Sequence, residues 1–204
     1  MVVIHYTALA TTQQAVERLC DPQAEVSAHY LIAEDGQLLR LVAEQHRAWH
    51  AGAGAWGGSM DVNSRSIGIE LTNDGQTPFA ARQIDRLERL LADIMTRWDI
   101  PVQGVIAHSD MAPTRKSDPG ARFDWRRLAL AGLSVWPEPN ADEHVDFAAA
   151  ARRFGYPDAE PEAVLAAFRL RFRPWAKGPA DATDRAMIGD LAARYPVDRA
   201  PASA

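Results

Sequence analysis

The sequence has almost no cysteine and no long apolar run, and both absences limit what the chain can be. Its single cysteine, Cys20, excludes a disulfide framework within the chain, and we expect this residue to be a small buried apolar side chain of a helix. No apolar stretch reaches the roughly 18 residues that a membrane-spanning helix needs. The sequence therefore predicts no membrane span.

An excess of basic charge is also missing. The chain has 22 Lys and Arg against 27 Asp and Glu, which gives a formal net charge of -5. Proteins that bind nucleic acid or an anionic membrane surface by charge show the opposite balance. We therefore expect neither partner, and we expect a monomer.

Strand and helix patterns alternate over the first two-thirds of the chain. This alternation predicts an α/β fold with a mixed central sheet flanked by helices. β-branched or apolar runs predict short strands at residues 2–6, 28–33, 37–42, 66–71 and 104–108. Amphipathic patterns predict helices at residues 11–20, 77–98 (with Thr77 as its cap) and 123–133. The segment 43–65 has no clear period, and loops of such length are often functional.

The last third of the chain has a different character. A proline-containing segment, 136–140, is interpreted as a linker. Three stretches with acidic starts and apolar stripes follow it, and they predict a small three-helix domain. We therefore expect a catalytic-type domain at 1–136, a three-helix domain at 140–196, and a frayed tail.

Two histidines stand where predicted strands end. His5 closes the first strand, His108 closes the last, and Asp118 follows across the loop "IAHSDMAPTRKSDPG". Two imidazoles and a carboxylate form a three-ligand set for catalytic zinc, which leaves a fourth position for water. The spacing matches no zinc-finger or HExxH pattern, so a structural role for each histidine stays open.

Two further charged residues fit a hydrolytic site. Glu70 interrupts the apolar strand "SIGIEL", and a buried unpaired carboxylate is costly, so it has either a partner or function, or a side chain that faces solvent. Lys116 precedes Asp118 by two positions, which in an extended segment places both side chains on one side. A cation there can stabilise a developing oxyanion, and an exposed loop lysine is the alternative.

Motifs in the first 120 residues resemble those of a known family. In order, the stretches "VVIHYTA", "VSAHYLIAEDG", "AWHAGAGAWGG", "VNSRSIGIELTN" and "VIAHSDMAPTRKSDPG" are similar to successive motifs of the zinc-dependent N-acetylmuramoyl-L-alanine amidases of the Amidase_2 family. The resemblance implies hydrolysis of the amide between N-acetylmuramic acid and L-alanine in peptidoglycan or muropeptides. It implies His5, His108 and Asp118 as zinc ligands, Glu70 as the general base and Lys116 as the oxyanion stabiliser.

The loop 43–65 supplies candidates for substrate binding. Trp49 and Trp56 offer flat apolar faces for sugar or stem peptide, although aromatic loop residues can instead cover a core. His50 either hydrogen-bonds the substrate or orients a catalytic group. Asn63 either contacts the substrate or holds the loop in shape.

The C-terminal helices resemble peptidoglycan-binding domains of the three-helix type. The stretches "ARRFGYPD", "AVLAAFRLRFRP" and "DATDRAMIGDLAARY" carry this resemblance, although a packing appendage would fit the same pattern. Wall binding implies the bacterial cell envelope or periplasm. No signal peptide precedes the first strand, so the cytoplasm is the alternative. A recognition module that does not cut, and a zinc peptidase that cuts within the stem peptide, also remain open.

Overall fold

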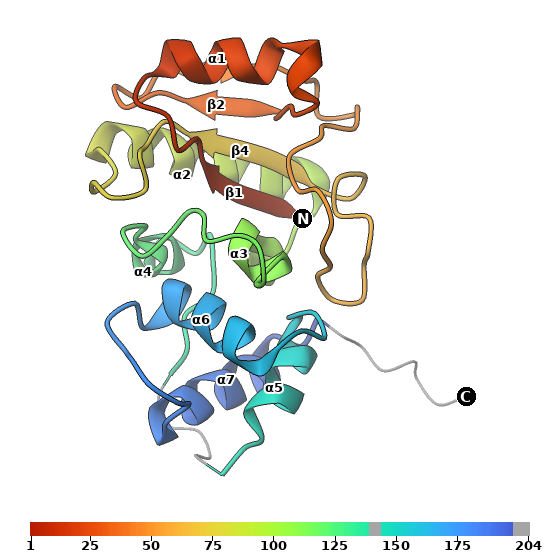
Figure 1. Ribbon diagram of the computed structural model, residues 1–204, viewed down its shortest axis with the longest axis vertical. Helices are drawn as coiled ribbons and strands as arrows, with labels where there is room; N and C mark the ends of the chain where they lie inside the picture. Colours follow the sequence, from red (N-terminus) through yellow and green to blue (C-terminus); the bar gives the residue numbers. More distant parts are fainter. Residues whose placement is uncertain (139–143, 198–204) are drawn as a thin grey trace.

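Five short strands form one mixed sheet in the computed structural model, which describes residues 1–138 and 144–197 (Figure 1). They lie in the order β3-β2-β4-β1-β5. All neighbouring pairs are parallel except β2 and β3, which form the antiparallel hairpin. The strands are β1 (Val2–Tyr6), β2 (Tyr30–Ile32), β3 (Leu38–Arg40), β4 (Ile67–Leu71) and β5 (Val105–Ala107). The mixed sheet predicted from the sequence is confirmed.

Helices flank this sheet and continue beyond it. The α-helices are α1 (Thr12–Cys20), α2 (Ala81–Trp98), α3 (His108–Met111), α4 (Trp125–Leu130), α5 (Phe147–Phe154), α6 (Pro161–Phe172) and α7 (Ala182–Arg194). Two short 3-10 turns are η1 (Pro22–Ala24) and η2 (Val102–Gly104). Among the described residues, none of the helices has the length and apolar character that crossing a membrane requires.

Three local predictions differ from the structure. Helix α2 begins at Ala81 rather than near Thr77, because the Thr77 backbone N–H and hydroxyl donate to Asp74 Oδ1 in a separate turn. Cys20 ends α1 with an exposed side chain, so its predicted burial is wrong. The stretch after His108, predicted to be a loop, begins with the single helical turn α3.

The alternation of side chains along the strands divides the sheet into two faces. Val2 and Ile4 of β1 pack in a core cluster with Leu87 and Leu91 of α2. On the opposite face, Val3 packs in a second cluster with side chains of α5, α6 and α7. His5, the other odd-numbered residue of β1, lies on the same face as Val3. Its side chain therefore points away from the α2 core.

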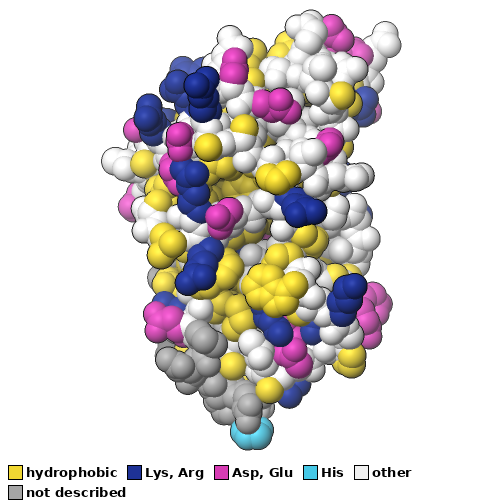
Figure 2. Space-filling view, turned by 90° about the vertical axis from the view of Figure 1, so that its left-hand side faces the viewer, with side chains coloured by type: hydrophobic (Ala, Val, Ile, Leu, Met, Phe, Trp, Pro, Cys, Tyr) yellow, Lys and Arg dark blue, Asp and Glu magenta, His cyan; other side chains and the backbone are white. Residues whose placement is uncertain are grey.

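The C-terminal helices share their core with the sheet. We call residues 1–138 the sheet lobe and 144–197 the helical lobe, and Figure 1 shows α3 and α6 facing each other where the lobes meet. Trp56 of the long loop packs edge-on against Phe154 and Tyr156, with ring centroids 5.4 and 5.3 Å apart. On the face drawn in Figure 2, apolar side chains gather across the middle of the molecule, at the height of this junction.

This shared core bears on the predicted domain division. Residues 139–143, which include the last two positions of the predicted linker, lie outside the described residues, as does the predicted frayed tail from residue 198 onward. Ile106 and Met111 of the sheet lobe belong to the same buried cluster as Phe168 and Leu191 of the helical lobe. Because this cluster crosses the boundary, removing the helical lobe would expose apolar core to water.

Candidate metal centre and active site

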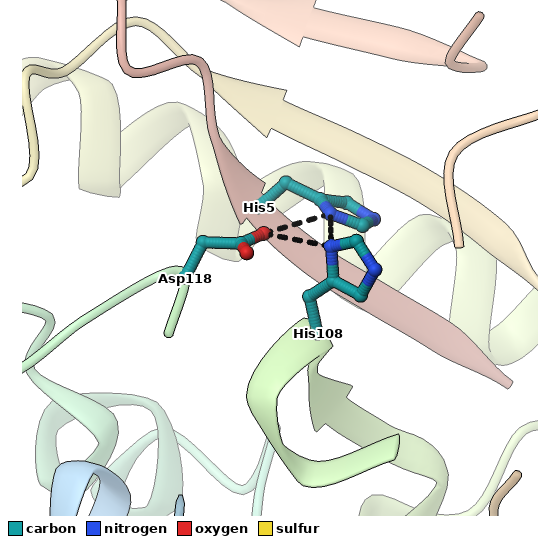
Figure 3. Close-up of side chains that lie close together, drawn as sticks. All are labelled: His5, His108 and Asp118. Atoms are coloured by element: carbon teal, nitrogen blue, oxygen red, sulfur yellow. Dashed lines mark hydrogen bonds and ion pairs between the residues drawn. The ribbon is translucent and has the colours of Figure 1, made fainter. Parts of the chain in front are cut away.

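Two histidines and an aspartate converge at the carboxyl ends of the parallel strands. His5 projects from β1, His108 from the first residue of α3, and Asp118 from the loop that follows (Figure 3). The Nδ1 atoms of the histidines are 2.9 Å apart, and Asp118 Oδ2 is 2.9 Å from the first and 3.0 Å from the second. We call these residues the ligand triad, and all three are buried.

Hydrogen bonds on the far side of His5 determine which ring nitrogen is protonated. Ser66 donates its hydroxyl proton to the Val62 carbonyl at 2.6 Å, so Ser66 Oγ accepts from His50 Nε2 at 3.3 Å. His50 Nδ1 is then an acceptor, and His5 Nε2 donates to it at 3.0 Å. This relay leaves His5 Nδ1 with a free lone pair that points at the other two members of the triad.

A glycine makes room for this relay. A Cβ atom at Gly68 of β4 would lie 2.3 Å from the His50 ring, a distance that excludes any side chain there unless the ring moves. The loop that carries His50 is held by Asn63, whose Oδ1 accepts from the backbone N–H groups of His50 and Ala51 at 3.1 and 2.8 Å. The position of His50 is therefore set by both a strand and a loop.

His108 has the same protonation pattern. Its Nε2 donates to the Ala51 carbonyl at 2.8 Å, which leaves Nδ1 unprotonated. Burial, reinforced by the charge that His108 carries when protonated, lowers the pKa of His5 to about 4 despite the opposing effect of Asp118. The Nδ1 atoms of His5 and His108 and the Oδ2 atom of Asp118 thus face one another, and a cation between them relieves the repulsion of their lone pairs.

Asp118 is in the charged form that a metal ligand needs. Burial by itself would raise the pKa of this carboxyl, but the adjacent His108 and His5 side chains hold it below its usual value. Its backbone carbonyl accepts from the Ser109 N–H at 3.0 Å, which ties the loop to α3. A carboxylate and two neutral imidazoles are a suitable ligand set for a divalent metal ion.

Glu70 lies beside the triad because of the strand register. It is paired with His5 across the parallel β1 and β4 strands, so both side chains belong to the same face. Its Oε2 atom is buried and has no hydrogen-bond partner within the described part of the chain. Burial, with a smaller contribution from the charge of Asp118, raises the pKa of Glu70 to about 8, whereas Lys116 acts in the opposite direction. A carboxyl group in this range is suited to proton transfer near neutral pH.

A cavity of about 340 Å³ opens over these residues. Its walls include the triad, Glu70 and Lys116, so the structure brings all the residues of the predicted catalytic group together. Trp49 and Arg115 also line it. Arg115, which the sequence analysis does not single out, donates to the Ala53 carbonyl at 2.7 Å and so holds the rim of the long loop.

Three of the four residues predicted to bind substrate have other positions or roles. Trp56 is only 1% exposed, lies in the core between the lobes and is absent from the cavity wall, so its predicted contact with substrate is wrong. Asn63 is likewise outside the wall and shapes the loop instead. His50 lines the cavity, but its ring nitrogens are committed to His5 and Ser66, so it orients the His5 ring and has no ring nitrogen left for substrate. Trp49 lines the cavity and is 53% exposed.

The two tryptophans should therefore respond differently to replacement by alanine. Trp56→Ala should destabilise the fold by about 3–5 kcal/mol, because it removes a buried ring from the junction of the lobes. Trp49→Ala should leave the melting temperature nearly unchanged and raise KM for the substrate. Thermal unfolding and steady-state kinetics check both outcomes. A lower melting temperature for Trp49→Ala with unchanged KM would contradict the assignment.

Comparisons with known proteins agree with the motifs and with the fold. Residues 1–121 match the family described as N-acetylmuramoyl-L-alanine amidase. The chain is 37% identical to the N-acetylmuramoyl-L-alanine amidase AmiD of Escherichia coli strain K12, in an alignment that covers 97% of this chain and 84% of AmiD. It is 39% identical to the 1,6-anhydro-N-acetylmuramyl-L-alanine amidase AmpD of Enterobacter cloacae, over 50% of this chain and 55% of AmpD.

Solved structures give the same result. The fold is similar to that of E. coli AmiD in complex with the substrate anhydro-N-acetylmuramic acid-L-Ala-D-gamma-Glu-L-Lys, with a TM-score of 0.85 and 36% identity, covering 96% of this chain and 89% of that one. It is also similar to AmpDh3 of Pseudomonas aeruginosa in complex with anhydromuramic pentapeptide, with a TM-score of 0.86 and 32% identity, covering 96% and 92%.

Fold and site together define an enzyme of mixed α/β architecture with a candidate metal centre where parallel strands end. The chain belongs to the N-acetylmuramoyl-L-alanine amidase family, whose members are hydrolases of an amide bond. The likeness to AmiD extends over both lobes, because it covers nearly the whole chain.

Proposed function

We propose that the protein is a zinc-dependent amidase that hydrolyses the amide between N-acetylmuramic acid and L-alanine in peptidoglycan or muropeptides. The observation that carries the proposal is the ligand triad, with two unprotonated Nδ1 atoms and a carboxylate aimed at one point beside Glu70. Family membership supports the substrate class, as do the muropeptides bound to AmiD and AmpDh3.

Zinc fits the donor set of the triad. Two imidazole nitrogens and one carboxylate oxygen are the ligands of many catalytic zinc sites, with bonds of about 2 Å. The three donor atoms are 2.9 to 3.0 Å from one another, close enough that one ion can reach all of them at that length. When bound, zinc supplies a Lewis acid that activates a water molecule and polarises the substrate carbonyl.

The chain's own residues move the protons and stabilise the charge. Glu70, on the same face as His5, accepts a proton from the attacking water and returns it to the departing L-alanine amine. Lys116 lines the same cavity, where its ammonium group stabilises negative charge as it develops on the carbonyl oxygen. Trp49 offers an exposed ring in the cavity wall for the sugar or stem peptide.

A wall-binding role for α5, α6 and α7 is the second part of the proposal. Their sequence resemblance to three-helix peptidoglycan-binding domains supports it. Attachment to the wall would raise the effective substrate concentration at the cavity. We further propose that the protein acts in the bacterial cell envelope or periplasm, and that it acts as a monomer.

Product analysis tests the proposal against its two alternatives. After the protein is mixed with a defined muropeptide, mass spectrometry should find a free stem peptide with an L-alanine amine and the intact sugar. A chelator should abolish this release, and added zinc should restore it. Cleavage inside the stem would make the protein a peptidase. An intact muropeptide in the presence of bound zinc would favour a recognition module.

A further inference from the structure

A buried aspartate controls the corner of the chain from which His108 projects. Asp110 lies in α3, two residues after His108, and its side chain is completely buried. Its Oδ2 accepts from the backbone N–H of Ala107 at 2.9 Å. Ala107 ends β5 and directly precedes His108, so this bond fixes the turn at which the strand becomes a helix.

Both oxygens of Asp110 are also bonded to the helical lobe. Arg171 of α6 donates from Nη1 to Oδ2 at 2.5 Å, and the Tyr156 hydroxyl donates to Oδ1 at 2.8 Å. These partners are 61 and 46 positions away in the sequence. The carboxylate next to a predicted metal ligand therefore depends on the helical lobe for its charge partner.

Arg171 holds the strand as well as the helix. Its Nη2 donates to the Val105 carbonyl of β5 at 3.0 Å and to Ser134 Oγ at 3.1 Å. Its guanidinium lies 4.3 Å from the centroid of the Trp125 ring. A buried charge with these contacts has little freedom to shift, because any movement leaves polar atoms unpaired. Arg171 thus connects the beginning of β5 to the beginning of α3.

We infer that Asp110, Arg171 and Tyr156, which we call the Asp110 network, position His108 for metal binding, so that the helical lobe helps to build the catalytic centre. The inference rests on the proposed zinc site. No member of the network belongs to the wall of the active-site cavity, so these are positioning residues. Their effect reaches the His108 imidazole through the backbone segment from Val105 to Asp110, to which His108 belongs.

Two conservative variants test the network. Tyr156→Phe removes one hydroxyl and keeps the ring that packs on Trp56, and Arg171→Lys keeps the charge but loses the planar fork. Each should lower zinc affinity by about 10-fold, the lower end of the effect usual for residues that orient metal ligands. Competition with a chromophoric chelator measures that affinity, and the absorption spectrum of the cobalt-substituted protein reports a change in ligand geometry.

Arg169→Lys is the matched control. Arg169 lies in the same helix and is buried, but it pairs with Asp184 of α7 and makes no hydrogen bond to α3. This variant should lower the melting temperature of the metal-free protein without changing zinc affinity or the cobalt spectrum.

The outcomes separate positioning from general stability. If zinc affinity in all three variants falls in proportion to the melting temperature, the network is structural only and the inference is wrong. The inference would also be wrong if Tyr156→Phe bound zinc with wild-type affinity. If Arg171→Lys does not fold, Tyr156→Phe alone tests the inference. Absence of zinc binding by the wild-type protein would instead refute the zinc proposal, and the inference with it.

Discussion

Replacing Glu70 with glutamine should leave metal binding intact and lower turnover by roughly 100-fold or more. Glutamine has nearly the same shape as glutamate, and Glu70 is not one of the three residues of the ligand triad. The amide cannot accept a proton from water, so the variant lacks the general base. Metal content and kcat on a defined muropeptide, measured on the same preparation, check both halves of this expectation.

The pH dependence of the hydrolysis rate is a second test of Glu70 as the general base. A general base works in its deprotonated form, so the rate should rise as the pH passes the pKa of Glu70 and then level off. That pKa is about 8 in the metal-free protein. A bound cation favours the carboxylate, so the midpoint in the zinc-loaded enzyme should lie below 8. Glu70→Gln should lack this rising limb.

A carboxylate outside the cavity is the control for Glu70. Glu88 lies on α2 and pairs with Arg127, so Glu88→Gln should keep both the rate and the pH profile. If Glu70→Gln retained the wild-type rate, another group would have to be the base.

Replacing His108 with alanine should abolish metal retention and with it the activity. Two donors would remain of three, and the Ala51 carbonyl would lose the N–H that it accepts from His108. Zinc should raise the melting temperature of the wild-type protein, because a ligand that binds only the folded state stabilises it, and it should not do so for the variant. Metal analysis after dialysis, and thermal unfolding with and without zinc, measure this.

His46 offers the matched histidine control. It is exposed and is not part of the triad, and its hydrogen bonds to His29 and Ala43 use only backbone atoms, which alanine retains. His46→Ala should therefore bind zinc and cut substrate as the wild type does. A His108→Ala protein that still held one equivalent of zinc would show that the triad is not the metal site.

Much of the site could be predicted because its signals are local. Residues at the ends of parallel strands lie at one edge of a sheet, and side chains alternate between its faces, so a histidine closing one strand and a glutamate within another are brought together by register. His5 and Glu70 are paired in this way. The wider set, with Asp118 and Lys116, followed from motifs of the family rather than from spacing alone.

Other assignments failed or were missed because they depend on contacts between distant segments. Trp56 and Trp49 lie in one loop and look equivalent in the sequence, yet only Trp49 lines the cavity, since Trp56 meets the rings of the helical lobe. The role of Ser66 in setting the protonation of His50 had no sequence signal, because it depends on a loop folding onto a strand.

The sequence by itself determined the order of strands and helices, the residues of the candidate metal centre and the family. Each of these is encoded in short stretches, through side-chain periodicity or a motif. Only the tertiary structure decided that the helical lobe shares a core with the sheet and bonds to Asp110 beside His108. The physical reason is that a buried carboxylate must find its partners wherever the fold supplies them, and here Arg171 and Tyr156 come from far along the chain.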